Sequence, residues 1–171
     1  MVRFGAGTRN HVSLHHTEGG EGSERVTGPF HVLLVEDNPG DADLTREGIA
    51  TSLLRIELTV ASNGSEAVEC IRKRGRYASA ATPDLILLDL NLPGIDGKAV
   101  LAEIKQDKEL RRIPVSILTS STAEQDVMQS YALGANCYVV KPIDFKSFQA
   151  VVRDLEKFWF GTVKLPITPN A

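Results

Sequence analysis

The sequence predicts a doubly wound α/β fold, in which helices cover both faces of a parallel sheet. Five short apolar or β-branched runs recur along the chain, and amphipathic stretches with helical signals separate them. Runs of this length are typical of strands that are buried on both faces. Parallel neighbours need helical crossovers, so five strand–helix alternations with short loops favour a single open parallel sheet.

The strand and helix signals alternate in a regular order after the first 29 residues. We expect strands over 31–35, 56–61, 84–89, 113–119 and 136–141. We expect helices over 40–53, 65–75, 96–107, 123–133 and 144–160. Ser65 and Asp144 are expected to cap two of these helices, because short polar side chains accept hydrogen bonds from the free N–H groups of a first turn. Gly75 and Gly134 are expected just after two helix ends, where glycine tolerates left-handed backbone.

The chain divides into a tail, one domain and a short arm. Residues 1–29 hold six of the 14 glycines and three of the four histidines and show no apolar periodicity. Such a segment buries too little surface to offset its ordering entropy, so we expect a disordered tail. A metal clamp on its three histidines is the weaker alternative, because a flexible tail does not preform a site. We expect the domain over 30–160 and a C-terminal arm over 161–171.

Composition excludes several functional classes. The 171 residues are 42% apolar and 24% charged, which is typical of a globular protein. A net charge of −3 argues against nucleic acid or anionic lipid as a partner. The longest apolar runs fall far short of the ~20 residues of a membrane span. The first residues lack a secretory signal, so we expect a cytoplasmic protein whose Cys70 and Cys137 are reduced thiols.

Chemically active residues follow four of the five predicted strands. Glu36 and Asp37 follow the first strand, and Asp89, Thr119 and Lys141 close the third, fourth and fifth. Each alone is explained as well by a helix cap, a turn or a solvated charge. Ligands of an open parallel sheet, however, bind outside the carboxyl ends of its strands. Converging carboxylates repel one another, and a shared hard cation such as Mg²⁺ relieves that cost.

This set of residues resembles the receiver domain of two-component response regulators, the CheY-like family. The likeness extends over about residues 30–157 and includes the Leu-Pro-Gly-Ile-Asp-Gly stretch at 92–97. It rests on the order and the strand-end placement of Glu36, Asp37, Asp89, Thr119, Tyr138 and Lys141. The resemblance implies a flavodoxin-like sheet with the strand order 2-1-3-4-5, flanked by five helices.

The resemblance also implies a role for each site residue. Asp89 is the expected phosphoacceptor, and Asp37 and Asp89 are expected to bind Mg²⁺ together with the backbone carbonyl of Asn91. Glu36 stands where many family members have Asp and is expected to act through a bridging water. Lys141 is expected to pair with the incoming phosphoryl group.

Two further residues are expected to form the family's switch. Thr119 would donate its hydroxyl to a phosphoryl oxygen, and Tyr138 would move into the space that Thr119 vacates. As a member of this family, the chain would catalyse its own phosphorylation from a histidine kinase and its own hydrolysis, without being an enzyme in the usual sense. A half-buried strand aromatic is the plain alternative for Tyr138.

Two other functions are alternatives to a phosphorylated receiver. A haloacid-dehalogenase-type phosphatase also uses a nucleophilic aspartate with Mg²⁺, but it needs a second acid where this chain has Asn91. A degenerate receiver that acts only as a scaffold predicts the loss of a site residue, and none is lost. Too few residues follow Phe160 for a DNA-binding unit, so we expect a single-domain receiver.

The subtype is indicated by the two ends of the domain. The run at 36–44 and the sequence Phe158-Trp159-Phe160, followed by Leu165-Pro166, resemble the small receivers encoded alongside bacterial phytochromes. This likeness implies a phytochrome-type sensor histidine kinase as the partner.

We also expect a homodimer built on the face of the last strand and the last helix and extended by the arm. The stripe that should pack on the sheet consists of Phe145, Phe148, Val152, Leu155 and Trp159. Val151 and Phe158 widen this apolar arc, and Phe160 continues it past the helix, so Phe158, Trp159 and Phe160 are the expected dimer residues. The alternative is that the arm folds back on its own domain.

Overall fold

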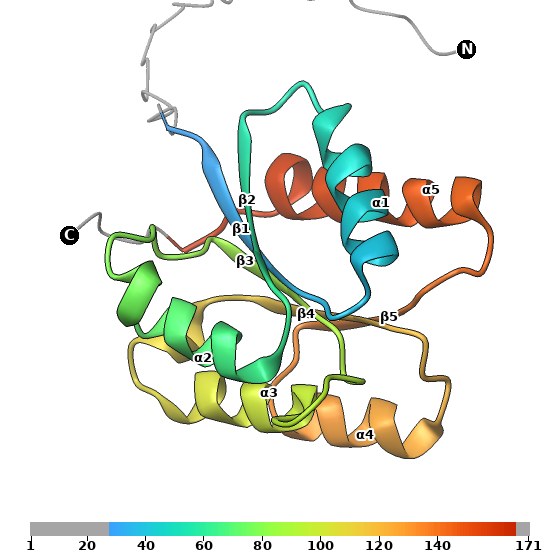
Figure 1. Cartoon of the computed structure of the whole chain (residues 1–171). Coiled ribbons are helices and arrows are strands. Elements are labelled where there is room, and N and C mark those ends of the chain that lie inside the picture. Colours follow the sequence, from blue (N-terminus) through green and yellow to red (C-terminus); the bar gives the residue numbers. More distant parts are fainter. Residues whose placement is uncertain (1–27, 167–171) are drawn as a thin grey trace, which may run out of the picture.

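Five strands form one parallel sheet in the order β2-β1-β3-β4-β5 (Figure 1). A computed structural model describes residues 28–166 of the chain. The strands are β1 (Phe30–Val35), β2 (Ile56–Ala61), β3 (Leu85–Leu88), β4 (Val115–Thr119) and β5 (Cys137–Val140). The predicted fold class and strand order are therefore confirmed.

Five α-helices cover the two faces of this sheet. They are α1 (Pro39–Ala50), α2 (Gly64–Ile71), α3 (Gly97–Gln106), α4 (Glu124–Ala132) and α5 (Phe145–Glu156). Helices α1 and α5 lie together on one face, and α2, α3 and α4 lie on the other (Figure 1). Within residues 28–166, no helix is both long enough and apolar enough to span a membrane.

Strand β1 shows why a central strand carries apolar residues at successive positions. Leu33 and Val35 belong to the core beneath α2 and α3, whereas Val32 and Leu34 belong to the core beneath α1 and α5. All four side chains are buried. Since alternate residues of a strand point to opposite faces, a strand covered on both sides has apolar residues in succession where it is buried.

The caps of two helices test the local predictions. Asp144 caps α5 as expected, since its carboxylate accepts from the Ser147 N–H at 2.9 Å. The prediction for Ser65 is wrong, because α2 begins at Gly64 and Asn63 is its cap. The Asn63 side chain accepts from the Glu66 N–H at 2.9 Å. An Asn two residues earlier fulfils the same requirement for a side-chain acceptor.

Of the two predicted helix ends, one is confirmed and the other is wrong. Gly134 directly follows Leu133, the C-cap residue of α4, and has a φ of +98°, as predicted. Gly75 does not end α2, which stops at Ile71, and Lys73 takes the left-handed conformation with a φ of +52°. Gly75 instead opens a short 3₁₀ turn that places Tyr77 in the core.

The last predicted helix changes type before it ends. After α5, the chain continues as a π-helix, η3 (Lys157–Thr162). The ring of Phe160 stacks on Phe30 with centroids 4.4 Å apart, and Val163 and Leu165 pack against the core beneath α1 and α5. The described part of the arm thus folds back on its own domain. The tail predicted for residues 1–29 lies outside the described residues, apart from Gly28 and Pro29.

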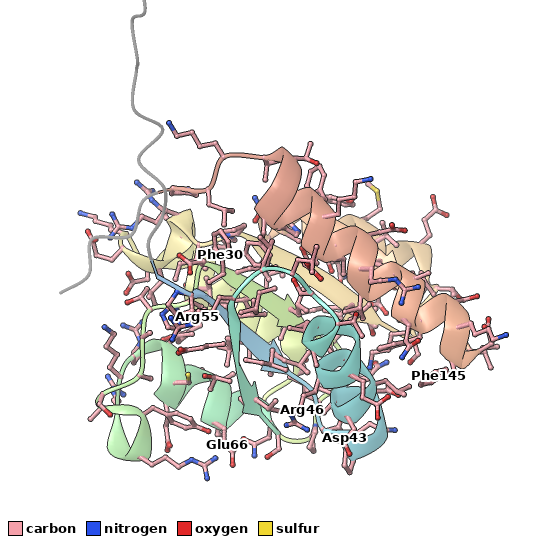
Figure 2. The ribbon with its side chains drawn as sticks, turned by 90° about the horizontal axis from the view of Figure 1, so that it is seen from above. Phe30, Asp43, Arg46, Arg55, Glu66 and Phe145 are labelled. Carbon is pink, nitrogen blue, oxygen red and sulfur yellow. The ribbon has the colours of Figure 1, made fainter. Side chains whose placement is uncertain are left out.

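The predicted apolar stripe of the last helix is confirmed except at its first member. Phe148, Val152, Leu155 and Trp159 are buried. Phe145 is instead 48% exposed and lies at the outer end of α5 (Figure 2). Phe145 is the first residue of α5 and follows the loop from the edge strand β5, so its side chain does not reach the core.

Candidate functional site

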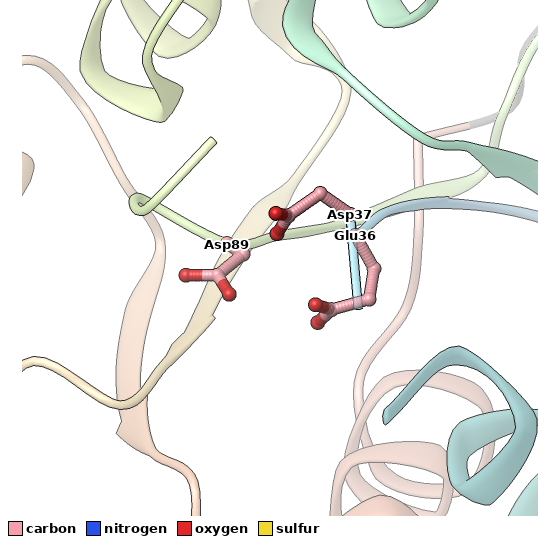
Figure 3. Close-up of side chains that lie close together, drawn as sticks. All are labelled: Glu36, Asp37 and Asp89. Carbon is pink, nitrogen blue, oxygen red and sulfur yellow. The ribbon is translucent and has the colours of Figure 1, made fainter. Parts of the chain in front are cut away.

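Three carboxylates meet at the carboxyl edge of the sheet (Figure 3). Glu36 and Asp37 follow β1, and Asp89 follows β3. These strands are direct neighbours, with Val35 opposite Leu88, so the residues after them come together. Each side chain offers one oxygen, and these oxygens lie within 4.8 Å of one another. Glu36 and Asp89 are buried and Asp37 is exposed, so the cluster is open to solvent on the side of Asp37. A set of oxygen donors of this kind suits a hard divalent cation.

Lys141 follows β5 and binds two of these carboxylates. Its ammonium donates to Glu36 Oε2 at 2.5 Å and to Asp89 Oδ2 at 2.7 Å. It also donates to Asp41 Oδ2 at 2.9 Å. Asp41 is a member of the site that the sequence prediction missed. It stands in the first turn of α1, where an acid is ordinarily explained by the helix dipole.

Burial and pairing act in opposite directions on the charges of this cluster. Burial alone would lower the pKa of Lys141, but hydrogen bonds to Asp89, Glu36 and Asp41 outweigh it and raise that pKa. Burial raises the pKa of Glu36, and the hydrogen bond and charge of Lys141 offset only part of that rise. Lys141 is therefore held as a cation at the centre of the cluster.

The remaining oxygen of Asp89 is also held in place. The Thr119 hydroxyl donates to Asp89 Oδ1 at 2.7 Å, and the backbone N–H of Asn91 donates to the same oxygen at 3.0 Å. Thr119 is buried at the end of β4. The Asn91 side-chain amide lies 3.3 Å from Ser120 Oγ. Both oxygens of Asp89 thus have a fixed orientation before any reaction.

Close backbone packing supports the segment after Asp89. Gly97 is the first residue of α3, and a Cβ atom there would lie 2.1 Å from the carbonyl oxygen of Asp89. The Gly97 N–H donates to the carbonyl of Leu90 at 3.0 Å. Only a residue without a side chain allows α3 to approach the acidic edge this closely.

Tyr138 lies beside the site without contacting the carboxylates. Its hydroxyl donates to the backbone carbonyl of Ser121 at 3.0 Å, and its half-buried ring packs against the core beneath α2 and α3. The Ser121 hydroxyl donates to Asp126, whose carboxylate also accepts from Lys98. Tyr138 is therefore joined to the loop that follows Thr119.

The three predicted dimer residues lie apart from the acidic cluster, in η3. Phe158 is 46% exposed and Phe160 is half-buried, but Trp159 is only 8% exposed. The side chain of Trp159 belongs to the core beneath α1 and α5 of its own domain. Of the three, Phe158 presents the most surface to a partner.

Comparison with known proteins identifies the family to which the chain belongs. The family model for the response regulator receiver domain matches residues 32–153. The response regulator Rcp1 of Synechocystis sp. is 44% identical over 144 residues, which are 84% of this chain and 98% of that protein.

Solved structures of the same kind have the same fold. The crystal structure of the phosphorylated cyanobacterial phytochrome response regulator RcpA has a TM-score of 0.80 at 44% identity and covers 82% of this chain and 100% of its own. The Mn²⁺-bound form of Rcp1 has a TM-score of 0.79 at 45% identity and covers 81% of this chain and 100% of its own. The chain belongs to the family of response regulator receiver domains.

Proposed function

We propose that this protein is a response regulator of a two-component phosphorelay, which accepts a phosphoryl group on Asp89. The observation that carries the proposal is the position of the Asp89 carboxylate, between the Lys141 ammonium and the Thr119 hydroxyl at 2.7 Å each. A scaffold without phosphorylation would not need both oxygens held in this way. The protein acts as a phosphoacceptor that signals, rather than as an enzyme with a separate substrate.

The reaction is an in-line displacement at phosphorus. An oxygen of Asp89 forms a bond to the phosphorus of a phosphohistidine, and the phosphorus–nitrogen bond breaks with its electron pair returning to the imidazole. Lys141 and Thr119 stand beside the attacking carboxylate, where a cation and a hydroxyl donor stabilise charge on the phosphoryl oxygens. Attack of water on the phosphorus later releases inorganic phosphate and restores the carboxylate.

The residues present also fit a divalent cation, which we propose to be Mg²⁺. Glu36, Asp37 and Asp89 supply the hard oxygen donors, and the backbone carbonyl of Asn91 is the further proposed ligand. Glu36 would act through water, as the family resemblance implies. When bound, the ion supplies positive charge for the phosphoryl oxygens. The Mn²⁺-bound form of the relative Rcp1 supports a divalent ion here.

The proposal is tested by labelling with acetyl phosphate and Mg²⁺. Intact-mass spectra are expected to show one added phosphoryl group in the wild type and none in Asp89→Asn, because an amide cannot act as the attacking carboxylate. Asp43→Asn is the matched control, since this aspartate is exposed on α1 and pairs with Arg46. Equal labelling of the wild type and Asp89→Asn would refute the assignment.

We propose that the phosphodonor is a phytochrome-type sensor histidine kinase in the cytoplasm. The similarity to RcpA and Rcp1 over more than four-fifths of the chain supports this choice. A purified phytochrome kinase from the same organism should transfer phosphate to Asp89 faster than a kinase of unrelated input does, and the rate should depend on illumination. Equal transfer from both kinases would contradict it.

We further propose a homodimer that uses the exposed face of η3. Phe158 is the proposed anchor, because it is the most exposed of the three aromatic residues of η3 and aromatic side chains often dominate the binding energy of an interface. Sedimentation at micromolar concentration should show a dimer for the wild type and a shift toward monomer for Phe158→Glu. Lys157→Glu, which changes the charge of the exposed neighbour, should have a smaller effect. A monomeric wild type, phosphorylated or not, would refute the dimer and leave the receiver assignment intact.

A further inference from the structure

Asp41 takes the third hydrogen bond of Lys141. An ammonium has three N–H donors. In this structure they go to Glu36, Asp89 and Asp41, at 2.5, 2.7 and 2.9 Å. The side chain of Lys141 is 7% exposed, so water has little access to it. No donor is left for a phosphoryl oxygen, and Lys141 must give up one carboxylate before it can bind one.

The three carboxylates differ in how easily they are released. The side chains of Glu36 and Asp89 are 2% and 6% exposed, whereas that of Asp41 is 31% exposed. A buried carboxylate that loses its partner bears a desolvation cost, whereas an exposed one is hydrated instead. Asp41 also makes the longest of the three bonds. It is therefore the partner that Lys141 exchanges at least cost.

Asp41 also differs in the element that carries it. Glu36 and Asp89 follow strands of the sheet, but Asp41 lies in the first turn of α1. That turn is fixed by Asn38, whose side chain accepts from the N–H groups of Gly40 and Asp41. The bond between Lys141 and Asp41 therefore ties the end of β5 to α1.

We propose that Asp41 is a positioning residue that holds Lys141 in the resting site and releases it when Asp89 is phosphorylated. This inference rests on the proposed function. The acyl phosphate brings new acceptor oxygens to Asp89, and Lys141 exchanges the Asp41 carboxylate for one of them. Until then, the negative charge of Asp41 opposes both this exchange and the approach of an anionic donor.

The inference is tested by the rate of labelling with acetyl phosphate in Mg²⁺, followed by intact mass. Asp41→Asn should be labelled about three to ten times faster than the wild type, because one negative charge near the phosphoryl group is removed. Asp41→Glu should restore a rate near that of the wild type, since its carboxylate still reaches the ammonium. Asp43→Asn removes a charge from the outer surface of the same helix (Figure 2) and should leave the rate unchanged.

Each result bears on the inference separately from the function. An unchanged or slower rate in Asp41→Asn, with normal labelling of the wild type, overturns the inference alone. An equal acceleration in Asp43→Asn also overturns it, because that result would reflect the total charge of α1. Thermal unfolding of each variant shows whether it is folded. If Asp41→Asn does not fold, the test rests on Asp41→Glu, and labelling of Asp41→Glu faster than that of the wild type would refute the role of the carboxylate. A wild type that is not labelled at all refutes the proposed function and this inference with it.

Discussion

The indole N–H of Trp159 donates a hydrogen bond to Ser116 Oγ at 2.8 Å, which joins the π-helical turn η3 to the second residue of β4. Ser116 is fully buried, and its hydroxyl oxygen also lies 2.9 Å from the Sγ of Cys137 in β5. Three elements therefore meet at one buried hydroxyl. The segment after α5 is a part of the folded domain, attached to the two strands that lead to Thr119 and Lys141.

This attachment predicts a loss of stability when Trp159 is changed. Trp159→Phe keeps an aromatic ring but removes the hydrogen bond, and it should lower the free energy of unfolding by about 1–2 kcal/mol. Trp159→Ala also leaves a cavity and should cost about 3–5 kcal/mol. Urea unfolding followed by circular dichroism measures both. Phe158→Ala, at an exposed position in the same turn, is the control and should cost less than either.

A second prediction concerns the close approach of α3 to the site. In Gly97→Ala the new Cβ atom would lie 2.1 Å from the Asp89 carbonyl oxygen and 2.6 Å from the Leu90 Cα, so the backbone must move. The variant should lose about 2 kcal/mol or more of stability and should be labelled more slowly by acetyl phosphate. In the matched variant Gly161→Ala, the nearest atom is 4.0 Å away and both properties should be nearly unchanged. Equal stability of the two variants would contradict the packing described for Gly97.

A third prediction concerns the divalent cation. Asp37→Asn removes a charged oxygen donor from the acidic cluster without touching the ion pairs of Lys141, so it should weaken Mg²⁺ and Mn²⁺ binding about tenfold or more. Titration calorimetry measures the affinity directly. Lys141→Ala should keep most of the cation affinity and lose phosphoryl transfer, since its ammonium faces Asp89. Unchanged affinity in Asp37→Asn would place the ion elsewhere.

A fourth prediction concerns acid stability. Hydrogen bonds from Lys98 and from the Ser121 hydroxyl hold the pKa of Asp126 below its ordinary value of 3.8. A depressed pKa in the folded state stabilises the protein above the unfolded pKa, and this contribution is lost as the pH falls through the folded pKa. Asp126→Asn should therefore lose less of its free energy of unfolding than the wild type does between about pH 5 and about pH 2.5.

Denaturant unfolding at a series of pH values tests this difference. Asp154→Asn removes a carboxylate from the exposed face of α5 and is the control for charge alone. The acid limb of Asp154→Asn should follow the wild type more closely than that of Asp126→Asn. Parallel behaviour of both variants and the wild type would show that the contacts of Asp126 do not contribute to stability.

Much of the fold was predictable because strand burial and strand-end chemistry are properties of short segments. The apolar run of β1 and the acids directly after it are enough to place Glu36 and Asp37 at an edge. The role of Asp41 was not predictable in this way. Its partner Lys141 is 100 positions away in the sequence, and an acid in a first helical turn has an ordinary local explanation.

The end of the domain shows the same limit. The apolar spacing of residues 144–160 suits one continuous helix, and nothing in it marks the change from α5 to a π-helix at Lys157. Within this π-helix the indole of Trp159 donates to Ser116, a residue on another element. The conformation of a helix end that hydrogen-bonds to a distant buried hydroxyl depends on tertiary contacts, and the local sequence pattern does not contain them.

The stacking of Phe160 on Phe30 has a consequence for circular permutation of this domain. It brings the first strand and the last turn of the described chain together, at the opposite end of β1 from the carboxylates. A short peptide that bridges these two points would permit circular permutation, with new termini opened in the loop before β3. The new linker and the new termini would lie away from Asp89. Such a permutant should therefore still be phosphorylated on Asp89, while the termini to which another domain can be fused lie at a different place on the surface.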